Sequence, residues 1–349
     1  MTSVKKKYLL LLFFLIIFYL IYNLISFNSK THKYKTIING KTMGTTYSVT
    51  INDSILSNDD DLLIDLKNSI DSILINVNNY FSTYIDSSEI NKVNRSENIE
   101  LSKTFTYVYK KAIEYCVLSD GMYDFTISPL TKLWGFADHN HHSFPSHTDI
   151  LNTVNNIGYK KIINISNNTN NYKIHKKRDI KIDLNSIAKG YAVDMIYKFL
   201  DTFKLEFSDY LVEIGGEIRT KNKSDNNWNI GIQHPIENSL ISKVLLDNYS
   251  MATSGTYNNY FINDGTEYSH IINPKTGYPI KHNILSATVI APVCIDADAL
   301  ATMLMILDWE EGIRIINNIN NTECLLILKN DNNDLTIKYS DKFSNFIVD

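Results

Sequence analysis

Apolar residues recur with helical spacing in four stretches of the chain. Residues 62–79 carry apolar side chains at intervals of three and four, which places them on one face of a helix. Residues 104–118 and 296–307 are helical by the same pattern. From residue 187 onward, apolar positions recur every four residues and are interleaved with further apolar residues, so this helix is expected to have a wide buried face.

The helix expected from residue 187 onward follows a strand-like run, KIDL at 181–184. Asn185 or Ser186 is expected to cap it. Lys189 and Gly190 lie in its first turn. One interpretation is a site for a phosphate-bearing ligand at the helix start. The other is an ordinary capped helix with a surface lysine, and this segment alone leaves both open.

Strand-like runs surround the helices. YKTIING and TTYSVTI, near the start, are expected to pair through a turn at Asn39-Gly40. Further runs lie at 210–219, 228–234 and 242–249, and the adjacent glycines at 215 and 216 indicate a bulge or a close backbone approach. The mixture of strands and helices predicts an α+β fold.

The N-terminus predicts a membrane anchor. Three lysines at 5–7 precede residues 8–27, which are uncharged and predominantly apolar. Twenty residues in a helix cover roughly 30 Å, one bilayer core. A cleaved signal peptide is the alternative, but the apolar run is long and no A-x-A cleavage site follows it. No cysteine comes directly after it either, so a lipoprotein cleavage site is absent. We expect an uncleaved anchor at 1–29, with the lysines in the cytoplasm and residues from 30 onward outside it.

Composition restricts the possible functions. The chain has 349 residues, enough for one large domain or two lobes around a cleft, and a formal net charge of -4 gives no global electrostatic case for nucleic acid. The three cysteines have no zinc-binding spacing, and a disulfide framework would leave one over.

Two segments combine glycine or aromatic residues that suit a planar ligand. In MGTTYSV, Gly44 would let a ligand approach the backbone while Met43 stacks on a flat ring; a plain strand containing a glycine is the alternative. In DGMYDFTISPLTKLWGF, residues 120–136, aromatic residues beside backbone donors suit a heterocycle. Core aromatics beside a turn would give the same pattern.

Two further segments carry oxygen ligands and a possible base. Asp298 and Thr302 are four residues apart, so both oxygens lie on one helix face, as in a Mg²⁺ site; an exposed aspartate and a threonine are the alternative. His270 precedes a turn at 273–277 and is either a general base or a structural histidine. Four histidines at 138–147 make a metal site conceivable, but a solvated loop is favoured.

Together, segments in one order along the chain resemble the ApbE family of FAD:protein FMN transferases. The segments are MGTTYSV, FSTYIDSSEINKVN, DGMYDFTISPLTKLWGF, KIDLNSIAKGYAVD, LVEIGGEIR, ATSGTY, SHIINPKTGYPI and DADALAT. The resemblance implies a single α+β domain at 30–349, made of two lobes of mixed sheets flanked by helices, with the FAD cleft between them.

The resemblance also implies an activity. Such enzymes bind FAD and Mg²⁺, split the pyrophosphate and attach FMN through a phosphoester to a threonine or serine of a target protein, releasing AMP. Typical targets are membrane flavoprotein subunits of the Nqr and Rnf type. With the anchor, this implies a single-pass protein of the bacterial inner membrane, with its catalytic domain on the periplasmic side.

Site residues are carried over by matching positions. The residues implied to line the FAD site are Met43, Tyr84, Met122, Tyr123, Asp124, Asp183, Lys189 and Ile272. The residues implied to hold Mg²⁺ are Ser186, through its backbone carbonyl, Asp298, Ala301 and Thr302. His270 matches the family histidine that activates the acceptor hydroxyl.

This chain departs from the family pattern at several positions. Asn185-Ser186 replaces a Gly-Gly pair, which keeps a carbonyl ligand but could alter the backbone angle. Glu213 and Glu217 stand where Asn and Asp are common. Asn273 replaces an Asp, which removes a charge near the expected base.

Three functional hypotheses follow. The first is the FMN transferase. The second is an FAD pyrophosphatase that uses water as the acceptor and releases FMN and AMP. The third is a non-catalytic extracytoplasmic flavin-binding protein, against which the presence of His270, Asp298 and Thr302 argues.

Overall fold

The computed structural model describes most of the chain after the expected anchor. The described residues are 35–52, 56, 59–136, 144–166, 172–224, 228–256, 260–263, 266–280, 283–330, 332 and 334–348. The anchor at 1–29 lies outside them and stays a prediction, as does much of the histidine loop at 138–147. Within the described ranges, no helix has the length and apolar character needed to cross a membrane.

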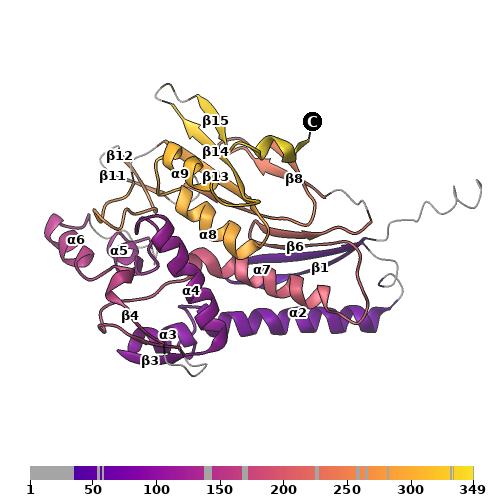
Figure 1. Cartoon of the computed structure of the whole chain (residues 1–349), viewed down its shortest axis with the longest axis horizontal. Helices are drawn as coiled ribbons and strands as arrows, with labels where there is room; N and C mark the ends of the chain where they lie inside the picture. Colours follow the sequence, from indigo (N-terminus) through magenta and orange to yellow (C-terminus); the bar gives the residue numbers. More distant parts are fainter. Residues whose placement is uncertain are drawn as a thin grey trace, which may run out of the picture.

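A large antiparallel sheet forms the centre of the described structure (Figure 1). In spatial order its strands are β1 (Lys35–Thr42), β2 (Thr45–Asn52), β6 (Tyr210–Ile214), β7 (Glu217–Lys221), β10 (Ser250–Gly255), β13 (Ile284–Ala291), β14 (Glu323–Lys329) and β15 (Leu335–Tyr339). Each neighbouring pair is antiparallel.

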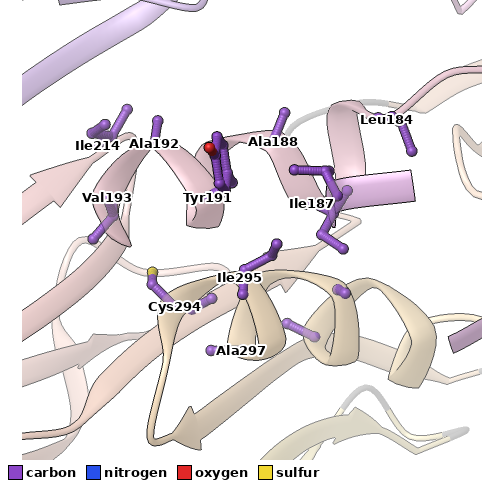
Figure 2. Close-up of a cluster of buried hydrophobic side chains, with 14 of the residues drawn as sticks. Leu184, Ile187, Ala188, Tyr191, Ala192, Val193, Ile214, Cys294, Ile295 and Ala297 are labelled. Carbon is purple, nitrogen blue, oxygen red and sulfur yellow. The ribbon is translucent and has the colours of Figure 1, made fainter. Parts of the chain in front are cut away.

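Helices cover one face of this sheet. The helices are α2 (Asp60–Phe81), α4 (Lys103–Leu118), α7 (Asn185–Asp201) and α8 (Cys294–Leu304). Helices α7 and α8 contact the sheet and each other, while α2 and α4 pack against them. Figure 2 shows apolar side chains such as Ile187 of α7 and Ile295 of α8 in this buried layer. The four helices predicted from periodicity are therefore confirmed.

A small sheet covers the opposite face of the large sheet. It contains β8 (Trp228–Gln233), β9 (Leu240–Leu246) and β16 (Ile347–Val348). A 3₁₀ turn at Phe343–Phe346 leads directly into β16. Side chains alternate along the central strands, as the two-residue period of a strand requires. Ala252 and Val289 face the helices, whereas Met251 and Ile290 pack under the small sheet.

The remaining elements complete the described structure. They are α3 (Glu89–Arg95), β3 (Asn98–Leu101), α5 (Ser128–Leu133), α6 (His147–Val154), a 3₁₀ turn (Tyr159–Lys161), β4 (Ile163–Ser166), β5 (Tyr172–His175), β11 (Tyr260–Asn263), β12 (Thr266–Ser269) and α9 (Trp309–Ile316). Among them, α9 contacts α8 and β14. A separate apolar cluster joins α5, α6 and the segment after β12 through Leu130, Trp134, Ile150, Ile157 and Ile272.

The first hairpin turns four residues later than predicted. Thr42 pairs with Thr45, so the turn lies at Met43-Gly44, both with positive φ, and Asn39-Gly40 belongs to β1. The prediction was wrong because Gly40 is a strand residue that leaves room for the side chain of Tyr47 on the neighbouring strand. A Cβ at Gly40 would lie 2.2 Å from Cε1 of Tyr47, whose ring covers the glycine.

Two other local predictions need correction. Gly215-Gly216 is not a bulge within one strand but the two-residue turn between β6 and β7, with φ values of 60° and 102°. The alternative of a close approach is confirmed, because a Cβ at Gly215 would lie 2.8 Å from Cγ2 of Thr45. Helix α7 has Leu184 as its N-cap, with no capping side chain. The side chain of Asp183 instead accepts the Asn185 N–H at 2.8 Å, so the aspartate satisfies the helix start.

Candidate active site

A cavity of about 930 Å³ brings together residues from distant segments. The predicted site residues that line it are Tyr84, Asp124, Asp183, Ser186, Lys189, His270, Ile272, Asp298 and Thr302. One wall comes from α7, α8 and Glu217 of β7, and we call it the helix wall. The segment 268–280, packed on α5 and α6, forms another side that we call the turn wall.

Four predicted site residues lie outside the lining. Met43, at the first hairpin turn, and Met122 are partly buried against the main core. Tyr123 and Ala301 are fully buried or nearly so. The Tyr123 hydroxyl lies 2.7 Å from Oγ of Ser186, so it supports a residue that does line the cavity.

The helix wall depends on close contact between α7 and α8. A Cβ at Gly190 would lie 2.3 Å from the Cys294 carbonyl oxygen and 2.8 Å from Cβ of Asp298. Only glycine lets the two helices approach this closely. The Gly190 N–H also donates to Oδ2 of Asp298 at 2.8 Å. The glycine in the first turn of α7 therefore positions the aspartate of α8.

Three charged side chains meet on the helix wall. Lys189 Nζ forms an ion pair with Oε1 of Glu217 and lies 3.9 Å from Oδ1 of Asp298. Both carboxylates are only 3% exposed. When both carboxylates are ionised, this buried cluster of two carboxylates and one ammonium carries one excess negative charge, which favours an added cation.

Burial controls how these groups ionise. Burial and the charge of Asp298 raise the pKa of Glu217 to about 8, although Lys189 opposes the shift. Burial also raises the pKa of Asp298, against Lys189 and the Gly190 N–H. Burial would lower the pKa of Lys189, but the negative charges of Asp298 and Glu217 raise it overall. The lysine therefore stays protonated.

The donor set on the helix wall fits a hard divalent cation. Mg²⁺ prefers oxygen ligands, and Asp298 supplies carboxylate oxygen while Thr302 supplies a hydroxyl. Thr302 Oγ1 lies 3.3 Å from Oγ of Ser254. The Ser186 carbonyl is the acceptor that a regular helix would offer to the Gly190 N–H. Here that N–H donates to the Asp298 carboxylate. Oε2 of Glu217 is buried without a hydrogen-bond partner, as expected beside a cation site.

Side-chain groups of three or more His, Cys, Asp or Glu residues arranged for a metal are absent from the part of the chain that the structure describes. The predicted Mg²⁺ set is not of that kind, because its other oxygens come from a hydroxyl and backbone carbonyls. Of the histidine loop, His147 is described: it begins α6, and its Nδ1 lies 2.8 Å from the Tyr278 hydroxyl.

A tight turn follows His270 on the turn wall. The Asn273 side chain accepts N–H groups from Lys275 and Thr276 at 2.8 and 3.2 Å, and Gly277 has a φ of 76°. The predicted turn at 273–277 is confirmed. Asn273 Oδ1 accepts both hydrogen bonds, as a carboxylate oxygen of an aspartate would. The Asn that replaces the family's Asp can therefore still hold the turn.

The turn wall is attached to α5 by one buried hydrogen bond and to a neighbouring turn by one exposed ion pair. Trp134 Nε1 donates to the Gly277 carbonyl at 2.8 Å in a buried position. Lys275 Nζ lies 2.9 Å from Asp120, and both side chains are at least half exposed. The buried hydrogen bond holds the segment that carries His270, whose ring lies edge-on to that of Phe136 with the ring centroids 6.3 Å apart.

Two predicted acidic residues have different surroundings. Asp124 accepts the Thr126 N–H and hydroxyl on one oxygen and the Tyr159 N–H on the other, so it ties two segments of the wall together. Asp183 accepts the Asn185 N–H, and burial raises the pKa of its carboxyl. Asp124 therefore has a structural role here beside any contact with a ligand.

The Asn185-Ser186 departure causes no strain at the helix start. Neither residue has a positive φ, so their side chains fit the helical backbone of α7. The serine also gains the contact with Tyr123.

Sequence reasoning missed several lining residues. Glu217 was noted as a departure, but its pairing with Lys189 is visible only in the structure. Others that line the cavity are Thr83, Phe125, Ile127, Ser128, Thr131, Phe136, Asn185, Thr253, Ser254, Gly255, Ile271, Met305 and Ile306. Many lie inside the motifs already quoted, so closeness to those motifs was the available signal.

Known proteins share both this sequence and this fold. The model of the ApbE family matches residues 43–326. A Haemophilus influenzae protein named FAD:protein FMN transferase is 35% identical over 311 residues, covering 86% of this chain and 88% of its own. A Vibrio cholerae protein of the same name is 36% identical over 301 residues, covering 84% and 87%.

The solved structures agree. The flavin transferase ApbE from Vibrio cholerae matches with a TM-score of 0.78 and 33% identity, covering 90% of this chain and 99% of that one. The fold and the curated relatives define an enzyme of the transferase class. The chain belongs to the ApbE family.

Proposed function

We propose that this transferase moves FMN from FAD to a threonine or serine of an acceptor protein and releases AMP, with Mg²⁺ as its metal. The observation that carries the proposal is the shared cavity, where the charged cluster of Lys189 and Asp298 and the side chain of His270 line one space. Family membership supports the same reaction.

The proposed reaction divides between the two walls. The acceptor hydroxyl oxygen bonds to the FMN phosphorus, the phosphorus–oxygen bond to AMP breaks, and AMP leaves with the bonding pair. His270 takes the hydroxyl proton at a ring nitrogen. Lys189 binds pyrophosphate oxygens, and Asp298, Thr302 and the Ser186 carbonyl hold Mg²⁺, which neutralises phosphate charge when bound.

The size of the cavity suits a dinucleotide substrate. About 930 Å³ lies near the upper end of the usual range for ligand pockets. Tyr84 lines it and is 86% exposed, so its ring is available to a flat ligand at the cavity surface. FAD is larger and flatter than most metabolites and would use both features.

The acceptor and the location belong to the proposal as well. We expect acceptors of the Nqr and Rnf membrane flavoprotein type, and an enzyme anchored in the bacterial inner membrane by residues 1–29. The lysines at 5–7 and the apolar run at 8–27 support this orientation, with the catalytic domain on the periplasmic side.

Mass spectrometry of an acceptor protein tests the reaction. The full chain in detergent is incubated with FAD, Mg²⁺ and an Nqr- or Rnf-type subunit, beside a His270→Ala variant. An FMN mass on a threonine or serine that the variant fails to add supports the transferase. Free FMN and AMP with an unlabelled acceptor would identify the pyrophosphatase instead, and bound but intact FAD would identify a binding protein.

A further inference from the structure

Glu217 carries a carboxylate oxygen whose partner is missing from the described protein atoms. The residue is 3% exposed and lines the cavity. Oε1 pairs with Lys189, while Oε2 is buried and has no hydrogen-bond partner. A buried carboxylate oxygen left unpaired is costly, so a partner that enters through the cavity is expected.

The hairpin places Glu217 beside the residues proposed to hold the metal. Glu217 is the first residue of β7 and follows directly on the Gly215-Gly216 turn, where it pairs with Ile214. Its carboxylate and that of Asp298 flank the same ammonium group of Lys189. When both carboxylates are ionised, they leave around the one lysine a negative charge that a single hydrogen-bond donor would not neutralise.

We propose that Glu217 is an additional carboxylate of the divalent-cation site, with Oε2 facing an ion bound through Asp298. The inference rests on the proposed function, because it concerns the same Mg²⁺ site. Hard cations are bound by carboxylate oxygens, and Glu217 lines the cavity while its Oε2 has no hydrogen-bond partner. The competing role is that Glu217 serves only as the partner of Lys189.

Mn²⁺ binding tests the assignment without relying on activity. The full chain in detergent is titrated with Mn²⁺ in the presence of FAD, and the free ion is followed by electron paramagnetic resonance. Glu217→Gln keeps the size of the side chain and removes its charge, and we expect it to weaken Mn²⁺ binding about tenfold or more.

Glu213→Gln is the matched control. Glu213 lies on the same hairpin, outside the cavity lining, and its Oε1 accepts the Gly216 N–H at 2.7 Å. A glutamine oxygen can accept the same bond, so this variant is expected to bind Mn²⁺ like the unmodified chain. Thermal unfolding with EDTA verifies that each variant is folded.

A second background separates ligation from support of the lysine. In Lys189→Met the ammonium is absent, so a glutamate that acts only through the lysine has nothing left to hold. We expect Glu217→Gln to weaken Mn²⁺ binding by a similar factor in this background. An effect confined to chains that retain Lys189 would assign Glu217 to pairing alone and overturn the proposal.

The remaining outcomes separate this inference from the proposed function. Unchanged Mn²⁺ binding in Glu217→Gln, with binding lost in Asp298→Asn, overturns the inference and leaves the Mg²⁺-dependent transferase in place. If the unmodified chain binds no Mn²⁺ with FAD present, the metal in the proposed function fails and the inference fails with it.

Discussion

The helix wall and the turn wall face one cavity but are stabilised in different ways. On the helix wall, Lys189 and Asp298 project from helices that contact each other directly through Gly190 and are buried in the main core. On the turn wall, His270 belongs to an irregular segment that Trp134 attaches to α5 through Gly277. The charged cluster is therefore positioned by packing within the main core, whereas the proposed base is positioned by a smaller apolar cluster around Ile272 and a few hydrogen bonds.

This difference matches the demands of the chemistry. A pyrophosphate and a cation need a charged site whose geometry is set before the ligand arrives. A base must also admit a second protein, and segments outside regular elements are where such sites usually lie. We therefore expect changes on the helix wall to affect binding and stability, and changes on the turn wall to affect the rate of transfer.

The largest effect is expected from removing one group of each wall in turn. Asp298→Asn should abolish Mn²⁺ binding and labelling, because it removes the charged oxygen ligand. His270→Ala should retain Mn²⁺ binding while labelling falls about 10²- to 10⁴-fold. Acceptor mass spectrometry and Mn²⁺ titration measure the two quantities. Loss of Mn²⁺ binding in the histidine variant would remove the division between the walls.

Gly190→Ala tests the contact between the helices. Alanine normally stabilises a helix by about 0.5–1 kcal/mol over glycine. Here the new Cβ would meet the Cys294 carbonyl at 2.3 Å, so we expect the free energy of unfolding to fall by about 1–3 kcal/mol and Mn²⁺ binding to weaken. Urea denaturation gives the stability.

Gly312→Ala is the control for this change. Gly312 is also helical, but its Cβ would meet only the flexible end of Leu304, at 2.6 Å. We expect a smaller loss than for Gly190→Ala. A stabilised Gly190→Ala protein with normal Mn²⁺ binding would mean that the helix wall tolerates separation of its helices.

Trp134→Phe tests the attachment of the turn wall. It keeps an aromatic ring and leaves the Gly277 carbonyl without its indole donor, which costs about 1–3 kcal/mol. We expect labelling to slow by about 3- to 10-fold, a change of roughly 1 kcal/mol in the barrier, with Mn²⁺ binding unchanged.

Trp228→Phe controls for the loss of an indole hydrogen bond. Trp228 donates to the Lys221 carbonyl at 3.0 Å on the small sheet, away from the cavity lining. Its removal should lower stability without slowing labelling. Equal labelling rates in the two tryptophan variants would show that Trp134 does not position the base.

The smallest effect is expected from Lys275→Ala. The ion pair with Asp120 is exposed, and such pairs contribute little. The hydrogen bond from Lys275 lowers the pKa of Asp120 below 3.8, so any stabilisation is present at neutral pH and is lost as the pH falls below that value. We expect labelling within about twofold of the unmodified chain. A large rate loss would place an exposed contact among those that fix His270.

Local patterns in the sequence determined the elements of this protein. The apolar spacing in α2, α4, α7 and α8 predicted those helices because a 3.6-residue period can bury only one face. The motifs carried the resemblance to the ApbE family, which the comparisons confirm. Most residues assigned to the site through those motifs line one cavity.

Only the tertiary structure decided how distant residues meet. The Asn39-Gly40 pair has the sequence of a turn, yet the ring of Tyr47 needs Gly40 as a strand residue. The spacing along the chain also gives no sign that Glu217 pairs with Lys189, or that Gly190 admits α8. Periodicity records whether a residue is buried, whereas the identity of its neighbour depends on contacts between segments far apart in the chain, which no local pattern encodes.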